Sequence, residues 1–122
     1  MASSIRTHQD HLEQLCANAT KLIDLYESKS VGILEACRGL SFICHELGIS
    51  NDQPFTTIIA VDSESDHFPG SEQRGLWSKA ALETVDRELR ELDDFYRNDM
   101  VKAGHALNEY ISTRQKGNSD DA

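Results

Sequence analysis

Apolar residues recur at intervals of three and four along most of this chain, which is the spacing of an amphipathic α-helix. The first stretch predicts a helix from about Ser4 to Glu27. Its apolar stripe is formed by Leu12, Leu15, Ala19, Leu22 and Tyr26. The polar residues 28–30 interrupt this stripe, so we expect the first helix to end there.

A second apolar stripe begins after this break and predicts a helix over residues 31–47. Ser30 is suited to cap its start, because a serine hydroxyl accepts a hydrogen bond from a free N–H group of the first helical turn. Gly48 is suited to end it, because glycine readily adopts the left-handed conformation that terminates many helices. The stripe is formed by Val31, Leu34, Cys37, Leu40, Cys44 and Leu47.

The segment 55–61 fits two kinds of structure. Its sequence, Phe-Thr-Thr-Ile-Ile-Ala-Val, is rich in β-branched residues, which favours a strand. The chain offers no second strand-like segment, however, and a lone strand leaves its backbone groups without partners. The apolar residues of the segment also fit one helical face. We therefore expect a short helix here, with Asn51 or Asp52 as its cap.

A longer pattern in the C-terminal third predicts a helix from Ser78, its cap, to about Lys116. Its apolar positions are Leu82, Val85, Leu89, Leu92, Tyr96, Ala103, Ala106, Leu107, Tyr110 and Ile111. The stripe becomes polar around Asn98–Met100, where we expect a bend or break, because a straight helix of about 57 Å is longer than a domain of this size. Residues 117–122 are expected to form a disordered tail. The expected fold is all-α: a single domain over residues 1–116, built as a bundle of four or five helices with a long C-terminal helical segment.

The charge of the chain argues against two classes of partner. Its 122 residues suffice for one domain and carry a formal net charge of −9. Such an acidic protein is not suited to bind nucleic acid or anionic lipid, since both need Lys and Arg to neutralise phosphates. No apolar run is long enough for a membrane span, and the first residues lack the apolar core of a signal peptide. We therefore expect a cytoplasmic protein with no cofactor and no membrane or nucleic-acid partner.

The three cysteines, Cys16, Cys37 and Cys44, lie within the apolar helical stripes. Cys37 and Cys44 are two turns apart, about 10 Å along a helix axis, which is too far for a disulfide. We interpret all three as small buried hydrophobic residues in a reducing compartment. The alternative is a catalytic cysteine, which needs an activating base. The nearby candidate is His45, about 100° around the helix from Cys44.

The negative charge is concentrated in one window. Residues 39–73 contain six carboxylates and no Lys or Arg, so this window contributes −6 of the net charge. At its centre, Asp62, Glu64, Asp66 and His67 stand within six consecutive residues. Gathered like charges repel one another. They are therefore either fully solvated or complemented by a cation, which can be a metal or the basic site of another protein.

Three interpretations of this cluster remain open. As a metal site it would use Asp62, Glu64, Asp66 and His67, although their spacing matches neither an EF-hand nor a zinc motif. As a capping and turn segment, Asp62 or Ser63 would bind backbone N–H groups while the other carboxylates are solvated. As a recognition surface, the carboxylates would contact a partner. Phosphate-loop, nucleophile-elbow and zinc-protease motifs are absent from the sequence, so we do not expect an enzyme.

Two further places in the sequence are candidates for a partner-binding surface. Trp77, the sole tryptophan, stands between a loop and a helix, where it is either a half-buried packing residue or an exposed binding hot spot. Asp93 and Asp94 belong to the charged face of the long helix. That face is mixed in sign and mainly solvated, but the two aspartates, together with Glu91, can extend an acidic patch.

An ordered set of residues resembles a small bacterial family. The set comprises Ala36-Cys37-Arg38-Gly39-Leu40, His45-Glu46-Leu47, Val61-Asp62-Ser63-Glu64-Ser65-Asp66-His67-Phe68-Pro69, Arg74 and Trp77. In that family an Ile/Val-Asp-Ser-Glu-x-Asp-His-Leu-Pro segment precedes Arg-x-x-Trp, and Phe68 departs from the aliphatic residue of the pattern. The likeness covers residues 31–90. Small acidic proteins of this kind are similar to the immunity partners of antibacterial toxins, including those of type VI or contact-dependent secretion.

The acidic window and the resemblance lead to a first hypothesis, a non-enzymatic immunity protein that binds a cognate toxin by charge complementarity. Its partner-binding residues would be Asp62, Glu64, Asp66, His67, Trp77, Asp93 and Asp94. The second hypothesis is a metal-binding protein or metal-dependent enzyme that uses the cluster at 62–67. The third is a homo-oligomer, a bundle that self-associates through the apolar face around Val101, Leu107 and Ile111.

Overall fold

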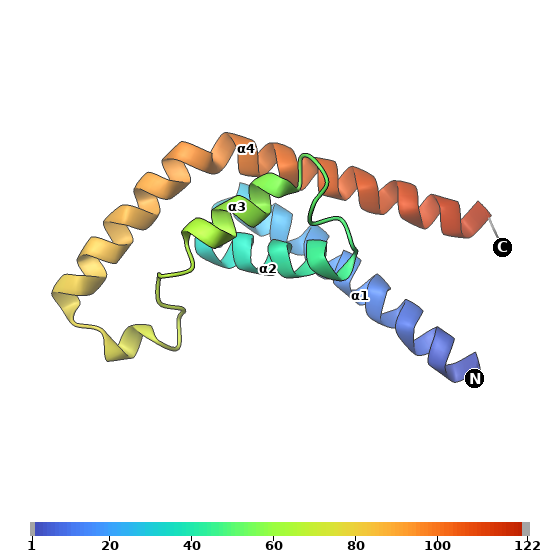
Figure 1. Cartoon of the computed structure of the whole chain (residues 1–122), viewed down its shortest axis with the longest axis horizontal. Helices are drawn as coiled ribbons and strands as arrows, with labels where there is room; N and C mark the ends of the chain where they lie inside the picture. Colours follow the sequence, from blue (N-terminus) through green and yellow to red (C-terminus); the bar gives the residue numbers. More distant parts are fainter. Residues whose placement is uncertain (1, 121–122) are drawn as a thin grey trace.

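The computed structural model describes the backbone of residues 2–120 and the side chains of residues 8–114. Four α-helices and one short 3-10 helix follow one another along the chain (Figure 1). They are α1 (Ala2–Glu27), α2 (Ile33–Glu46), α3 (Thr56–Glu64), η1 (Arg74–Leu76) and α4 (Lys79–Asp120). Residues 2–120 contain no strand. The prediction of an all-α bundle with a long C-terminal helix is confirmed.

The hydrophobic core lies where α1, α2 and α3 meet the C-terminal half of α4. The residues of this core with the least exposure are Ala19, Ala36, Cys37, Leu40, Cys44, Ile58, Val61, Met100, Ala103 and Leu107. At Gly104 the backbone of α4 comes very close to α1, because a Cβ atom there would lie 3.1 Å from Cγ2 of Ile23. No helix in the described part of the chain combines the length and the apolar character needed to cross a membrane.

The link between α1 and α2 differs from the prediction. Lys29 takes a positive φ of 67°, and the N–H of Ser30 donates to the carbonyl of Leu25 at 2.8 Å. Ser30 therefore belongs to the termination of α1, where its hydroxyl lies 2.9 Å from that of Ser28. Gly32 stands at the N-cap of α2, without a side-chain hydrogen bond. The prediction that Ser30 caps the second helix was wrong.

The end of α2 agrees with the prediction. Gly48 has a φ of 74°, and its N–H donates to the carbonyl of His45 at 3.1 Å. The N–H of Ile49 donates to the carbonyl of Cys44 at 3.0 Å, which completes a Schellman-type ending. Gly48 is thus the C′ glycine that the sequence indicated.

Residues 56–61 of the ambiguous segment are helical, as the absence of a partner strand led us to expect. Its start differs in detail from the expectation, because Phe55 occupies the N-cap and no side chain caps the helix. Asp52 contributes through its backbone, where its carbonyl accepts the N–H of Thr56 at 3.2 Å. Capping by the side chain of Asn51 or Asp52 was therefore a wrong prediction.

Helix α4 begins as predicted, since Oγ of Ser78 accepts the N–H of Ala81 at 3.1 Å. The helix is continuous but changes direction near its middle (Figure 1), so it bends and does not break. Its N-terminal half leaves the bundle as an arm, and the segment that follows α3 runs out to the tip of this arm. The helix includes 117–120, for which we expected a disordered tail, while 121–122 lie outside the described residues.

The apolar face considered for self-association packs inside the molecule. Leu107 and Ile111 are buried in the core, and Val101 is partly buried against it. A dimer through this face would have to open the bundle. The three cysteines are free and buried, in agreement with their interpretation as core residues.

Candidate functional site

The acidic cluster begins on the last turn of α3, and Ser65 fixes the turn that follows. Oγ of Ser65 is buried, donates to the carbonyl of Asp62 at 3.0 Å and lies 3.4 Å from Sγ of Cys37. A buried hydroxyl with a partner on each side holds the end of α3 against α2. Ser65 therefore fixes this turn as a donor to a carbonyl, which differs from the capping of N–H groups that we had considered for Asp62 or Ser63.

Arg38, on α2, holds the same turn from the other side. Its Nη2 donates to the carbonyl of Phe68 at 2.8 Å and to that of Ser65 at 3.3 Å. Because the two N–H bonds of Nη2 are fixed in the guanidinium plane, this one nitrogen constrains both carbonyls together. Asp66 and His67 lie between these two held residues and are exposed. The buried side chains of Ser65 and Phe68 thus present them to solvent from an ordered turn.

The predicted carboxylates do not converge. Asp62 is half-buried, whereas Glu64 and Asp66 are exposed. Of the sequence-predicted residues in this region, only Glu64 and His67 line a groove with α4. Asp62 and Asp66 lie outside that groove, so the folded chain does not bring the four residues of the cluster to one site.

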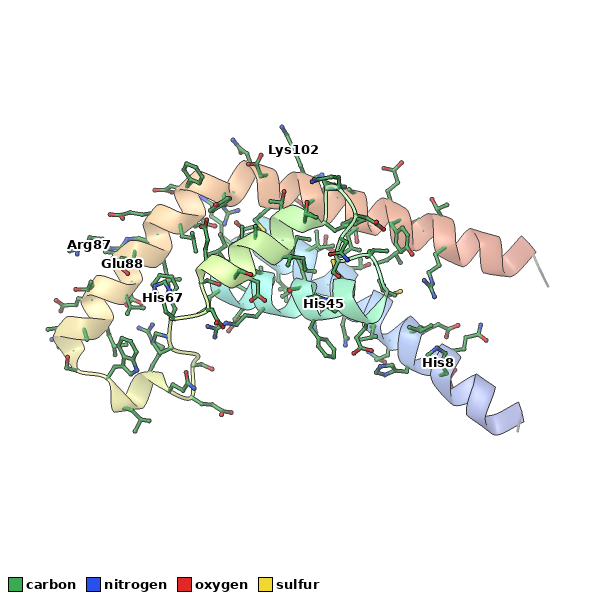
Figure 2. All side chains as sticks on the ribbon, in the orientation of Figure 1. His8, His45, His67, Arg87, Glu88 and Lys102 are labelled. Atoms are coloured by element: carbon green, nitrogen blue, oxygen red, sulfur yellow. The ribbon has the colours of Figure 1, made fainter. Side chains whose placement is uncertain are left out.

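The groove has a volume of about 480 Å³ and lies between the turn after α3 and the arm of α4. Its lining residues are Glu64, His67, Phe68, Glu88, Glu91, Leu92, Phe95 and Tyr96, a set that we call the acidic groove. Figure 2 shows His67, which belongs to the turn after α3, beside the part of α4 that carries Glu88. Three glutamates thus meet in one hollow, and none of its lining residues is Lys or Arg.

Aromatic side chains form the other part of the acidic groove. Phe95 is 76% exposed, which is unusual for so large an apolar side chain. Its ring meets that of Tyr96 edge to face, with centroids 4.8 Å apart. The hydroxyl of Tyr96 donates to Oε1 of Glu64 at 2.8 Å, and this hydrogen bond raises the pKa of Tyr96. The bond joins α4 to the end of α3 and fixes one oxygen of Glu64.

Of the α4 wall of the acidic groove, sequence reasoning named only Glu91, as a possible extension of an acidic patch. Glu88, Glu91 and Phe95 stand three and four residues apart, which places them on one helical face. This spacing could have marked an acidic and aromatic face on the helix. It could not have shown that the face meets the turn after α3, because that depends on the direction in which α4 bends.

Trp77 lies at the end of η1. Its side chain is only partly packed, because 42% of the residue is exposed. The preceding residue, Leu76, is 87% exposed. Arg74 joins this turn to α4 through an ion pair with Asp86, 2.9 Å between Nη1 and Oδ1. The hydrogen bond from Arg74 also lowers the pKa of Asp86. Trp77 is therefore presented at the tip of the arm, outside the acidic groove.

Asp93 is occupied within the molecule. Its Oδ1 accepts the hydroxyl of Tyr26 at 2.6 Å, and its Oδ2 accepts Nε of Arg97 at 3.0 Å. The guanidinium carbon of Arg97 lies 4.5 Å from the centroid of the Tyr26 ring. Asp94, which is exposed, lines a second hollow with Asp93 near the start of α2. Both aspartates lie outside the acidic groove.

Geometry gives no support to a metal centre in this region. Within the described residues, no group of three or more His, Cys, Asp and Glu side chains could hold a metal ion. Figure 2 shows His8, His45 and His67 well separated from one another. The thiols are equally unsuited to nucleophilic chemistry, since burial raises the pKa of Cys44 to about 11 and leaves little thiolate at neutral pH.

The arrangement can bind a cation, because the acidic groove combines carboxylates with exposed aromatic surface and its lining residues include no Lys or Arg. Comparisons of the chain with models of protein families, with curated proteins and with solved structures found no match.

Proposed function

We propose that this protein is a non-enzymatic inhibitor that binds and neutralises an antibacterial toxin, in the manner of an immunity protein. The observation that carries the proposal is the acidic groove, which is lined by Glu64, Glu88 and Glu91 together with an exposed Phe95. A concave acidic surface with an exposed aromatic residue is suited to a protruding basic segment of a protein partner. The resemblance of residues 61–69 to the motif of a small bacterial family supports the same function.

The charge of the chain suits this task. An inhibitor must meet its toxin quickly, and a field of one sign raises the association rate for a basic partner. The net charge of −9 supplies such a field. We expect the complex to form in the cytoplasm, where the three free cysteines stay reduced.

Co-expression tests the function. The product of the adjacent gene is expressed in a sensitive host with and without this chain, and growth is followed together with complex formation by gel filtration. We expect the chain to restore growth and to co-elute with the toxin. An inhibitory neighbouring product that neither binds the chain nor is neutralised by it would contradict the proposal.

Neutralisation without catalysis is checked in the same system. Because an inhibitor acts by occupancy, protection should require about one molecule of this chain per toxin molecule, in proportion to affinity. Protection by a small substoichiometric amount, with the toxin chemically altered, would instead indicate an enzyme.

A further inference from the structure

We propose that the acidic groove receives one arginine side chain of the protein partner. This inference rests on the proposed function only in that it assigns the arginine to the toxin. Its physical basis is a comparison between two tyrosine–carboxylate pairs within this chain.

In the first pair, the hydroxyl of Tyr26 donates to Asp93 at 2.6 Å. An arginine completes this pair, because Arg97 donates to the second oxygen of Asp93 at 3.0 Å. The guanidinium carbon of Arg97 also lies 4.5 Å from the centroid of the Tyr26 ring, within the range of a cation–π contact. Carboxylate, aromatic ring and guanidinium form one compact unit.

The second pair lies in the acidic groove. The hydroxyl of Tyr96 donates to Oε1 of Glu64 at 2.8 Å, which repeats the tyrosine–carboxylate bond of the first pair. The lining residues of the groove include no Lys or Arg to complete it. Arg87 is next to Glu88 in the sequence, but it is exposed and does not line the groove. The groove therefore has the carboxylate and the ring of the first unit, with room for a guanidinium.

The chemistry of the groove favours arginine over lysine. A guanidinium group is planar, so it can stack on the exposed Phe95 or on Tyr96 while its edge donates to carboxylates. Glu64 on one side and Glu88 and Glu91 on the other can accept several of its five N–H donors. A lysine ammonium is a compact, strongly hydrated charge, and it gains less from an aromatic wall.

The test uses the full chain and small probes. N-acetyl-arginine amide, N-acetyl-lysine amide and the neutral isostere N-acetyl-citrulline amide are titrated into isotope-labelled protein and followed by NMR. We expect the arginine probe to shift the signals of Glu64, Glu88, Phe95 and Tyr96 saturably, with a Kd of about 1 to 20 mM for so small a ligand. The lysine probe should bind about threefold or more weakly, and the citrulline probe should cause no saturable shift.

Variants locate the site. Glu64→Gln and Glu88→Gln should each weaken the arginine probe about fivefold, since each removes an acceptor and a charge. Glu13→Gln is the matched control, because Glu13 is exposed on α1 and should leave binding unchanged. Equal affinity for the arginine and lysine probes, shifts unaffected by both groove variants, or no saturable shift at about 50 mM would each overturn the inference.

Because no toxin is present, this result is independent of the co-expression test. Binding of the probe without toxin neutralisation would overturn the function and leave the groove assignment in place.

Discussion

Arg38 is the side chain that most directly determines how the acidic turn is presented. It reaches from α2 to the carbonyls of Ser65 and Phe68, at 3.3 and 2.8 Å. In the sequence, Arg38 is the last basic residue before the window 39–73, which contains no Lys or Arg. This position gave no indication of its role. Without the guanidinium group of Arg38, the carbonyl groups of Ser65 and Phe68 would lose a charged donor.

Replacement of Arg38 by Ala should therefore destabilise the protein by about 1–3 kcal/mol. Arg38→Lys should recover only part of this loss, because an ammonium group is more strongly hydrated and does not hold its donors in the fixed plane of a guanidinium group. Urea unfolding measures the free energies. Arg87→Ala, which removes an exposed arginine from α4, is the control and should change stability by less than about 0.5 kcal/mol. Equal effects of Arg38→Ala and Arg87→Ala would contradict the assigned role.

The buried cysteines should make the protein less stable at alkaline pH. Burial raises the pKa of Cys44 from 9.0 to about 11 and also raises the pKa values of Cys37 and Cys16. Above pH 9 the unfolded chain loses thiol protons that the folded chain still holds, so deprotonation favours unfolding. Tyr26 acts in the same direction, since burial and then its hydrogen bond to Asp93 raise its pKa.

We therefore expect ionisation of the Cys44 thiol to leave the free energy of unfolding unchanged below pH 9 and to lower it as the pH rises from 9 to 11. The contribution of Cys44 to this fall is about 1–3 kcal/mol. Urea unfolding at a series of pH values tests it, with Cys44→Ala as the comparison. The variant should be less stable at pH 8 but should show a shallower decline above pH 9. Identical slopes for parent and variant would show that Cys44 does not titrate in this way.

At the scale of elements, α4 has two parts with different roles. Its C-terminal half contributes Met100, Ala103 and Leu107 to the core, whereas its N-terminal half forms a wall of the acidic groove. The N-terminal arm has few buried residues, among them Val85. The hydrogen bonds of Asp93 and Tyr96 hold its inner end. Its outer end is held by the cap at Ser78 and by the ion pair of Arg74 with Asp86.

Ser78→Ala should destabilise the start of α4 by about 1 kcal/mol, because the N–H of Ala81 loses its acceptor. Hydrogen exchange should show faster exchange over the first turns of α4 and little change in the core half. Ser71→Ala, in the exposed turn before η1, is the matched control and should change neither the stability of the protein nor the exchange rates along α4. Uniformly faster exchange along the whole of α4 would indicate that the helix opens as one unit.

The helices were predictable from the sequence, whereas the acidic groove was not. Helical periodicity and the cap at Ser78 depend on residues close in the chain, and so does the glycine ending at Gly48. The role of Ser30 was misjudged because a non-glycine residue, Lys29, takes the left-handed conformation that ends α1. The contact of Glu64 with Tyr96 joins residues 32 positions apart, and it depends on the bend of α4 and on the turn held by Arg38. No local pattern encodes such a contact.

At the scale of the whole molecule, the net charge and the acidic groove have different roles. The net charge of −9 attracts any basic partner from a distance, and salt screens this attraction. The groove adds a local geometry of carboxylates and aromatic rings that a uniform field lacks. Binding to a toxin should therefore weaken with salt but should depend on where the charges lie and not only on their number.

The affinity of the toxin for two triple variants with the same change in charge tests this account most directly. The groove variant is Glu64→Gln/Glu88→Gln/Glu91→Gln, and the control is Asp10→Asn/Glu13→Gln/Asp24→Asn, which neutralises three exposed carboxylates on α1. Calorimetry at fixed salt, with melting temperatures to verify folding, should show that the groove variant raises the Kd by about 100-fold or more. The control should change the Kd by less than about threefold. Equal changes for the two variants, or unaltered binding by the groove variant, would contradict the claim that the toxin binds in the acidic groove.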